Sequence, residues 1–65
     1  MGYRNVWEIT IQTVTGNTLK RYIGKAREVD PYMRWLMLLD EVLKVTSRKL
    51  SDQERKVIPF YQIIG

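Results

Sequence analysis

Side chains suited to binding a single nucleic-acid strand occur at several places in this sequence. Tyr32 lies close to Arg34, and a loop tyrosine can stack on a base while an arginine contacts a phosphate or stacks as well. The basic residues that could meet the phosphates of the same strand are Lys25, Arg27, Arg48 and Lys49. The alternative, a partly buried tyrosine beside a solvated basic surface, stays open at this point.

The sequence lacks the residue types on which most catalytic and metal sites depend. It contains no Cys and no His, and it shows neither a Gly-rich phosphate loop nor a clustered carboxylate motif. Glu28 with Asp30, and Asp40 with Glu41, form short acidic pairs that we interpret as solvated or turn residues. We therefore predict a protein that is not an enzyme and that holds neither a metal ion nor another cofactor.

Length and charge limit the classes of protein to consider. The 65 residues suffice for one domain, and a domain of this size needs support from disulfides, metals or partner subunits. With no Cys and no His, association with other subunits is the expected support. The net charge of +4 suits phosphates as well as simple solubility. The longest apolar run, residues 35–39, is far below the roughly 20 residues of a membrane span, so we expect a cytoplasmic protein without membrane contact.

The first half of the chain has the pattern of two strands. Residues 6–15 alternate between apolar and polar side chains, which predicts a half-buried strand, and Gly16 and Asn17 predict a turn. Residues 19–29 predict a second, antiparallel strand with a bend at Gly24.

Residues 30–46 fit either a helix or a strand. As a helix, the stretch would begin with Asp30 as N-cap and Pro31 in the first turn, and its composition favours this choice slightly. As a strand, it would place alternate apolar residues on one face. Residues 46–55 are polar and turn-like, with a capping-box pattern from Ser51 to Glu54, and two short apolar runs flank Pro59.

The spacing of apolar, glycine and aspartate positions resembles that of the Sm and Sm-like proteins, including bacterial Hfq. The positions that match the first motif of the family are Ile9, Ile11, Gly16, Gly24, Ala26, Val29, Asp30, Tyr32, Met33, Trp35 and Met37. Ile58 and Ile63 are similar to the second motif. Arg34 stands where the family has an Asn, and Pro59 and Phe60 replace an Arg-Gly pair, which implies weak base preference.

The resemblance implies a mostly β fold, a five-stranded and strongly bent antiparallel barrel over a single domain of residues 1–65. A final strand that continues past Gly65 would make the natural chain longer. The resemblance also implies a cyclic homo-oligomer of about five to seven subunits that binds single-stranded RNA, or DNA, in nucleic-acid processing or chaperoning. The residues expected at the subunit interface are Lys56, Val57, Ile58, Tyr61, Ile63 and Ile64.

An α+β fold is the alternative that the local patterns leave open. It would combine the hairpin with a helix at 30–46 and a last strand. Such a chain would serve as a small protein-interaction or regulatory module that does not bind nucleic acid.

Overall fold

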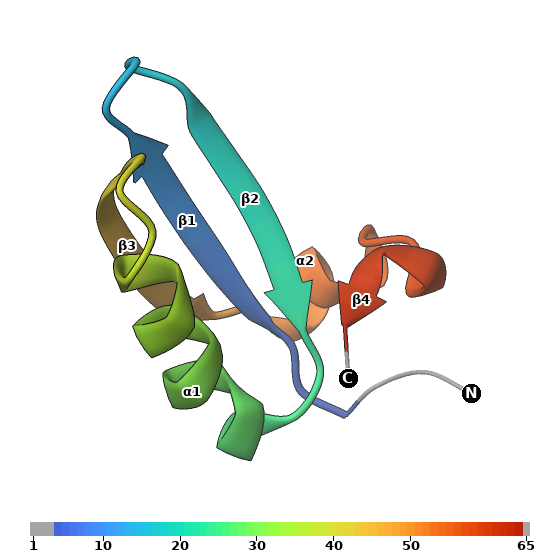
Figure 1. Cartoon of the computed structure of the whole chain (residues 1–65). Coiled ribbons are helices and arrows are strands. Elements are labelled where there is room, and N and C mark those ends of the chain that lie inside the picture. The colour runs from blue at the N-terminus through green and yellow to red at the C-terminus, as the bar shows by residue number, and fades with distance from the viewer. Residues whose placement is uncertain (1–3, 65) are drawn as a thin grey trace.

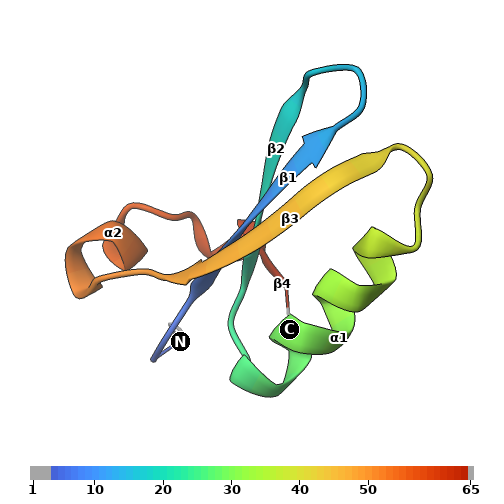
Figure 2. The same ribbon diagram turned by 90° about the vertical axis from the view of Figure 1, so that its left-hand side faces the viewer.

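The computed structural model describes residues 4–64 and shows an open four-stranded sheet with a helix packed on one face (Figures 1 and 2). The strands are β1 (Trp7–Thr13), β2 (Thr18–Ile23), β3 (Val42–Lys49) and β4 (Ile63–Ile64). They lie in the order β3-β1-β2-β4, with β1 antiparallel to both of its neighbours and β4 parallel to β2. The helices are α1 (Ala26–Met37) and α2 (Asp52–Lys56), and a 3-10 turn covers Phe60–Gln62.

The predicted five-stranded barrel is therefore wrong. The four strands form a mixed sheet that does not close on itself, and the protein belongs to the α+β class. The α+β alternative describes this class, although its helix was placed at 30–46 and the structure has it at 26–37. The barrel fails because Gly24 lies between β2 and α1, so the predicted second strand ends at Ile23 and does not bend and continue to Val29.

The β1–β2 hairpin agrees with the sequence pattern. Its register pairs Trp7 with Ile23 and Ile11 with Leu19, which places these four side chains on the face of the sheet that α1 covers. Gly16 in the turn has a φ angle of 89°, a left-handed conformation that glycine adopts without the steric cost of a Cβ atom. The turn residues that sequence analysis selected are therefore the ones that reverse the chain.

Helix α1 begins before the aspartate that was expected to cap it. Lys25 occupies the N-cap position in an extended conformation without a side-chain cap, and Asp30 lies inside the helix. Pro31 also lies inside, so the Arg27 carbonyl loses the N–H that would normally bond to it. The helix still forms because Val29 and Leu36, two turns apart, are both buried against the sheet. Tertiary burial thus outweighs weak capping.

The core lies between α1 and the sheet. Ile9 and Ile23 are fully buried there, and Ile11, Val29 and Leu36 are nearly so. Val6 and Leu50 are also buried, beyond the ends of β1 and β3, and the Leu50 N–H donates to the Val6 carbonyl over 2.9 Å. Burying these aliphatic side chains supplies most of the driving force for folding.

Strand β3 spans the end of the stretch 30–46, which the sequence left open between a helix and a strand, and the start of the stretch 46–55, which was predicted to be polar and turn-like. Its register pairs Ile11 with Val45 and Glu8 with Arg48, and an irregularity near Thr13 shifts the pairing at its start. Val45 packs against the core, which explains why this stretch is a strand despite its Lys and Ser content. β3 forms one edge of the sheet, and Lys44, Arg48 and Lys49 along it are exposed.

The C-terminal segment crosses from β3 to the opposite edge of the sheet. Ser51 and Glu54 form the predicted capping box at the start of α2. Figure 2 shows α2 on the side of the sheet opposite α1, after which the chain returns to place β4 beside β2. The apolar run before Pro59 is not a strand, and the run after it contributes only Ile63 and Ile64.

Candidate functional site

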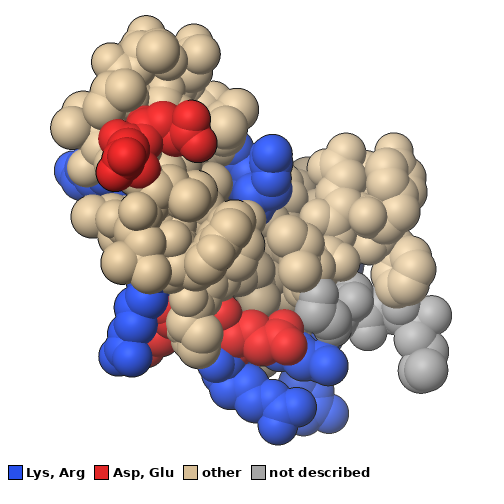
Figure 3. Space-filling model, viewed as in Figure 1, with Lys and Arg blue, Asp and Glu red and all other residues tan. Residues whose placement is uncertain are grey.

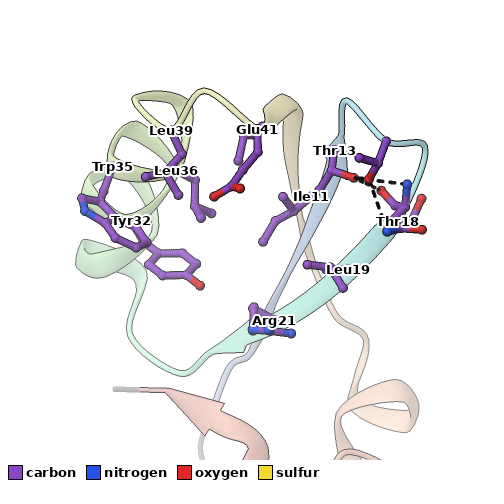
Figure 4. Close-up of a pocket in the computed structure, with 13 residues that line it drawn as sticks. Ile11, Thr13, Thr18, Leu19, Arg21, Tyr32, Trp35, Leu36, Leu39 and Glu41 are labelled. Carbon is purple, nitrogen blue, oxygen red and sulfur yellow. Dashed lines mark hydrogen bonds between the residues drawn. The ribbon is translucent and has the colours of Figure 1, made fainter.

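A groove of about 670 Å³ lies between α1 and β2 (Figure 4). It exists because α1 packs mainly against β3, at one side of the sheet, and leaves the same face of β2 partly uncovered. Tyr32 and Leu36 from α1 face Ile11 and Leu19 from the hairpin, as the close-up shows. The volume lies within the range of roughly 300–1,000 Å³ that is typical of ligand sites.

Two aromatic rings of α1 line one side of this groove. The centroids of Tyr32 and Trp35 are 6.2 Å apart, and the ring planes differ by 27°. Tyr32 is half-buried against the core, whereas Trp35 is 55% exposed. Leu19, across the groove on β2, is 43% exposed. An apolar surface is thus accessible beside the stacked pair of Tyr32 and Trp35.

Polar groups of both charge signs also line the groove. Arg21 comes from β2, and its Nη1 donates to the Lys20 carbonyl over 2.9 Å. Glu41 comes from the loop between α1 and β3, and its carbonyl accepts the Val14 N–H over 2.9 Å, which ties this loop to the hairpin. The groove therefore combines apolar walls with one guanidinium and one carboxylate, a combination typical of recognition sites.

Figure 3 shows the face of the molecule that carries α1. Uncharged side chains cover its middle, and basic side chains gather at the end where α1 begins. Lys25, Arg27 and Arg34, predicted to bind nucleic acid, are exposed at the start of α1 or along it.

The structure does not bring all six predicted nucleic-acid residues together. Tyr32 lies in the groove, while Arg48 lies on the other face of the sheet, because its partner Glu8 alternates with the core residue Ile9. Lys49 is exposed at the end of β3 and pairs in register with Trp7. Binding of nucleic acid by these residues stays a prediction.

The residues predicted for a subunit interface lie in the C-terminal segment. Lys56 ends α2, and Val57 and Tyr61 are 76% and 83% exposed. Ile58 is half-buried, and Ile63 and Ile64 form β4, which pairs with β2 of the same chain. Assembly through these residues into a ring stays a prediction as well.

A charged network crosses the face of the sheet opposite α1. Glu8, whose side chain is 12% exposed, lies 3.7 Å from Lys20 Nζ and 3.4 Å from Arg48 Nη2. Arg48 also bonds both carboxylate oxygens of Glu54 over 3.0 Å and 2.8 Å. The bond from Arg48, with help from the Ser51 N–H, lowers the pKa of Glu54 from its ordinary value of 4.5 to about 2. The network thus fastens α2 to β3 and β1.

We expect the Glu54 carboxyl to titrate near pH 2. Because its pKa is lower in the folded chain, its contribution to stability is present above about pH 4.5 and is lost as the pH falls towards 2. Arg48→Gln should raise this pKa towards 4.5, whereas Arg34→Gln should leave it unchanged, since no described carboxylate pairs with Arg34. Carbon-13 NMR of the side-chain carboxyl measures both. A pKa near 4.5 in the unsubstituted chain would contradict the network.

Among residues 4–64, no group of three or more His, Cys, Asp or Glu side chains is placed to hold a metal ion. Within the same residues, no helix has the length and apolar character needed to span a bilayer.

The structure is that of a small α+β protein with a groove between α1 and β2. No protein-family model matches the chain, and no curated protein or solved structure matches it. The resemblance to Sm-like proteins therefore stays a prediction, and the barrel that it implied is not the fold of residues 4–64.

Three residues that complete the groove were not among the site residues predicted from the sequence: Leu19, Arg21 and Glu41. A usable signal existed for two of them, because Leu19 and Arg21 alternate with Lys20 and share a strand face with Ile23. No comparable signal existed for Glu41, because its position depends on where the loop after α1 meets the hairpin.

Proposed function

We propose that this chain is a non-catalytic protein-interaction module whose groove between α1 and β2 binds a bulky apolar side chain of a partner protein. The observation that carries the proposal is the exposure of Trp35 and Leu19 on the two sides of the groove. A side chain inserted there would bury both surfaces and extend the stack of Tyr32 and Trp35. Aromatic anchors in grooves carry much of the energy of protein interfaces.

The charges favour a polypeptide over a nucleic acid as the occupant of the groove. Glu41 lines the groove and would repel a phosphate, whereas Arg21 offers a donor to a carboxylate or a carbonyl. The basic residues that would follow a nucleic-acid backbone are divided between α1 and β3, and Arg48 is already engaged by two carboxylates. A polypeptide can supply an apolar side chain and a carboxylate in one short segment.

Titration with N-acetyl-tryptophanamide, a minimal probe of an apolar side chain in a peptide, tests the groove. In nitrogen-15 NMR spectra we expect the indole N–H of Trp35 and the amide of Leu19 to shift, while the indole of Trp7 stays in place. Trp35→Ala should weaken binding about tenfold, or ~1.4 kcal/mol, because the stacking surface is lost. The matched control is Leu38→Ala, since Leu38 is 80% exposed and does not line the groove.

Three results would contradict the proposal. The first is a set of shifts that avoids the groove, and the second is equal binding by the Trp35→Ala and Leu38→Ala variants. The third is tight binding of a fluorescent poly-U oligomer at physiological salt with shifts at Tyr32 and Arg34, which would favour the nucleic-acid hypothesis.

A further inference from the structure

Within residues 4–64, the outer edge of β2 is unpaired over most of its length. β4 pairs with β2 at Tyr22 and Ile23, and no strand within residues 4–64 pairs with residues 18–21 on that side. Figure 1 shows the upper part of β2 with β1 on one side and no strand on the other. This open edge borders the groove, because Thr18, Leu19 and Arg21 belong to the groove lining.

Two hydrogen bonds establish which backbone groups face this edge. The Thr13 N–H donates to the Asn17 carbonyl over 2.9 Å, so odd-numbered residues of β2 direct their backbone groups towards β1. The Gly24 N–H donates to the Ile64 carbonyl over 2.9 Å, so even-numbered residues face the β4 side. Thr18 and Lys20 therefore direct their N–H and C=O groups outwards, in the direction where a further strand would lie.

The side chains along this edge alternate between two environments. Leu19 and Arg21 point to the face that carries the groove, and Lys20 points to the other face, where it lies 3.7 Å from Glu8. A segment added beside β2 would likewise alternate, with one side chain over Leu19 and the next beside Lys20. The groove side suits an apolar side chain, and the Lys20 side suits a carboxylate.

From this arrangement we infer that the partner binds as an extended segment that adds a strand to the β2 edge at residues 18–21. The segment alternates bulky apolar residues, which enter the groove, with acidic residues, which face Lys20. This inference rests on the proposed function, because it assumes that the groove binds a polypeptide. Main-chain hydrogen bonds supply affinity in such complexes, and the side-chain pockets supply specificity.

Charge argues against a second copy of this chain as the occupant. Pairing two β2 edges would bring Lys20 and Arg21 of both copies together, and like charges on adjacent strands are destabilising. An acidic segment would instead be attracted, because it would face Lys20 on a chain whose net charge is +4.

In the free protein, the Arg21 side chain satisfies one backbone acceptor of this edge. Its guanidinium donates to the Lys20 carbonyl, one of the outward-facing groups. An N–H of the incoming strand would replace this bond, and the freed guanidinium would add to the positive charge that attracts an acidic segment. Arg21 thus bonds the Lys20 carbonyl when no strand is added to the edge, and contributes positive charge when a strand is bound there.

The experiment uses linear decapeptides selected from a random displayed library against the whole chain. We expect enriched peptides to alternate apolar and acidic residues. With such a peptide bound, the Thr18 and Lys20 amides should become protected from hydrogen exchange, whereas the Leu19 and Arg21 amides, already bonded to β1, should change little. Lys20→Pro, which removes the outward N–H, should weaken binding at least about tenfold. Lys20→Ala, the matched control, keeps the N–H and should weaken it less.

The outcomes separate this inference from the proposed function. Peptides that shift Trp35 without protecting the Thr18 and Lys20 amides, or that bind Lys20→Pro as well as Lys20→Ala, would overturn strand addition and leave groove binding intact. Peptides that leave Trp35 unaffected would overturn both. A dimer in analytical ultracentrifugation that Lys20→Pro dissociates would overturn the assignment of this edge to an acidic partner.

Discussion

Ile9→Ala should remove about 2–5 kcal/mol of stability, the largest effect that we expect from a single substitution. Ile9 is fully buried in the central strand β1, between β2 and β3 and beneath α1. Shortening this side chain removes contacts on the core face and leaves a cavity that the surrounding strands cannot close without breaking their register. A domain of this length has only about 3–10 kcal/mol in total, so most of its stability would be lost. Urea denaturation followed by circular dichroism measures the change.

Leu38→Ala provides the control for this substitution. Leu38 is 80% exposed just after α1, so its truncation should change the free energy of unfolding by no more than about 0.5 kcal/mol. Equal effects of the two substitutions would mean that the core is not where the structure places it.

Arg34→Pro should cost about 3 kcal/mol and lower the helical signal in circular dichroism. Arg34 is exposed in the ninth position of the 12-residue helix α1, so the cost arises from the backbone: the ring clashes with the Asp30 carbonyl, whose hydrogen bond is lost. Pro31 already removes one such bond in this helix, and a second loss one turn later would leave little of it intact.

Arg34→Ala separates this structure from the barrel that sequence analysis predicted. Alanine has the highest helix propensity, and this should offset the loss of the favourable interaction between a basic side chain in the last turn and the helix dipole. The free energy of unfolding should therefore change by no more than about 0.5 kcal/mol. In a barrel, residue 34 would lie at the start of a strand, where alanine is unfavourable. Clear destabilisation by Arg34→Ala would therefore argue against α1.

Local chemistry was sufficient to predict the elements whose interactions are short in sequence. Ile9 and Ile11 alternate with polar residues, Gly16 supplies a left-handed turn, and Ser51 and Glu54 cap α2 by bonding each other's backbone. Each of these features depends on residues within a few positions of one another. They would form in much the same way in many folds.

The stretch from Gly24 to Lys49 could not be assigned in this way. Residues 33, 35 and 37 satisfy a strand pattern, while Val29 and Leu36 satisfy a helix pattern, and burial against Ile9 and Ile11 decides in favour of the helix. The polar composition near Ser47 does not predict a strand. β3 nevertheless forms there because β1 pairs with it along its length. Distant contacts override local preference at both places.

The candidate site was predictable in part for the same reason. Tyr32 was predicted as a loop aromatic that stacks on bases, and the structure places it on a helix in an apolar groove. Arg21 and Glu41 come from elements whose proximity depends on the β3-β1-β2-β4 order. A single sequence does not reveal that order when the central element is ambiguous.

The central position of β1 has a consequence for synthesis on the ribosome. Strand β1 needs β3, which ends at Lys49, to complete its hydrogen bonding, while its other neighbour β2 follows it directly in the chain. Until α1 and β3 have left the exit tunnel, the nascent chain can form the β1–β2 hairpin but cannot cover its apolar face, and an isolated hairpin is marginally stable in water. Stable folding must therefore await release of most of the chain, and during that interval Ile9 and Ile11 are available to chaperones.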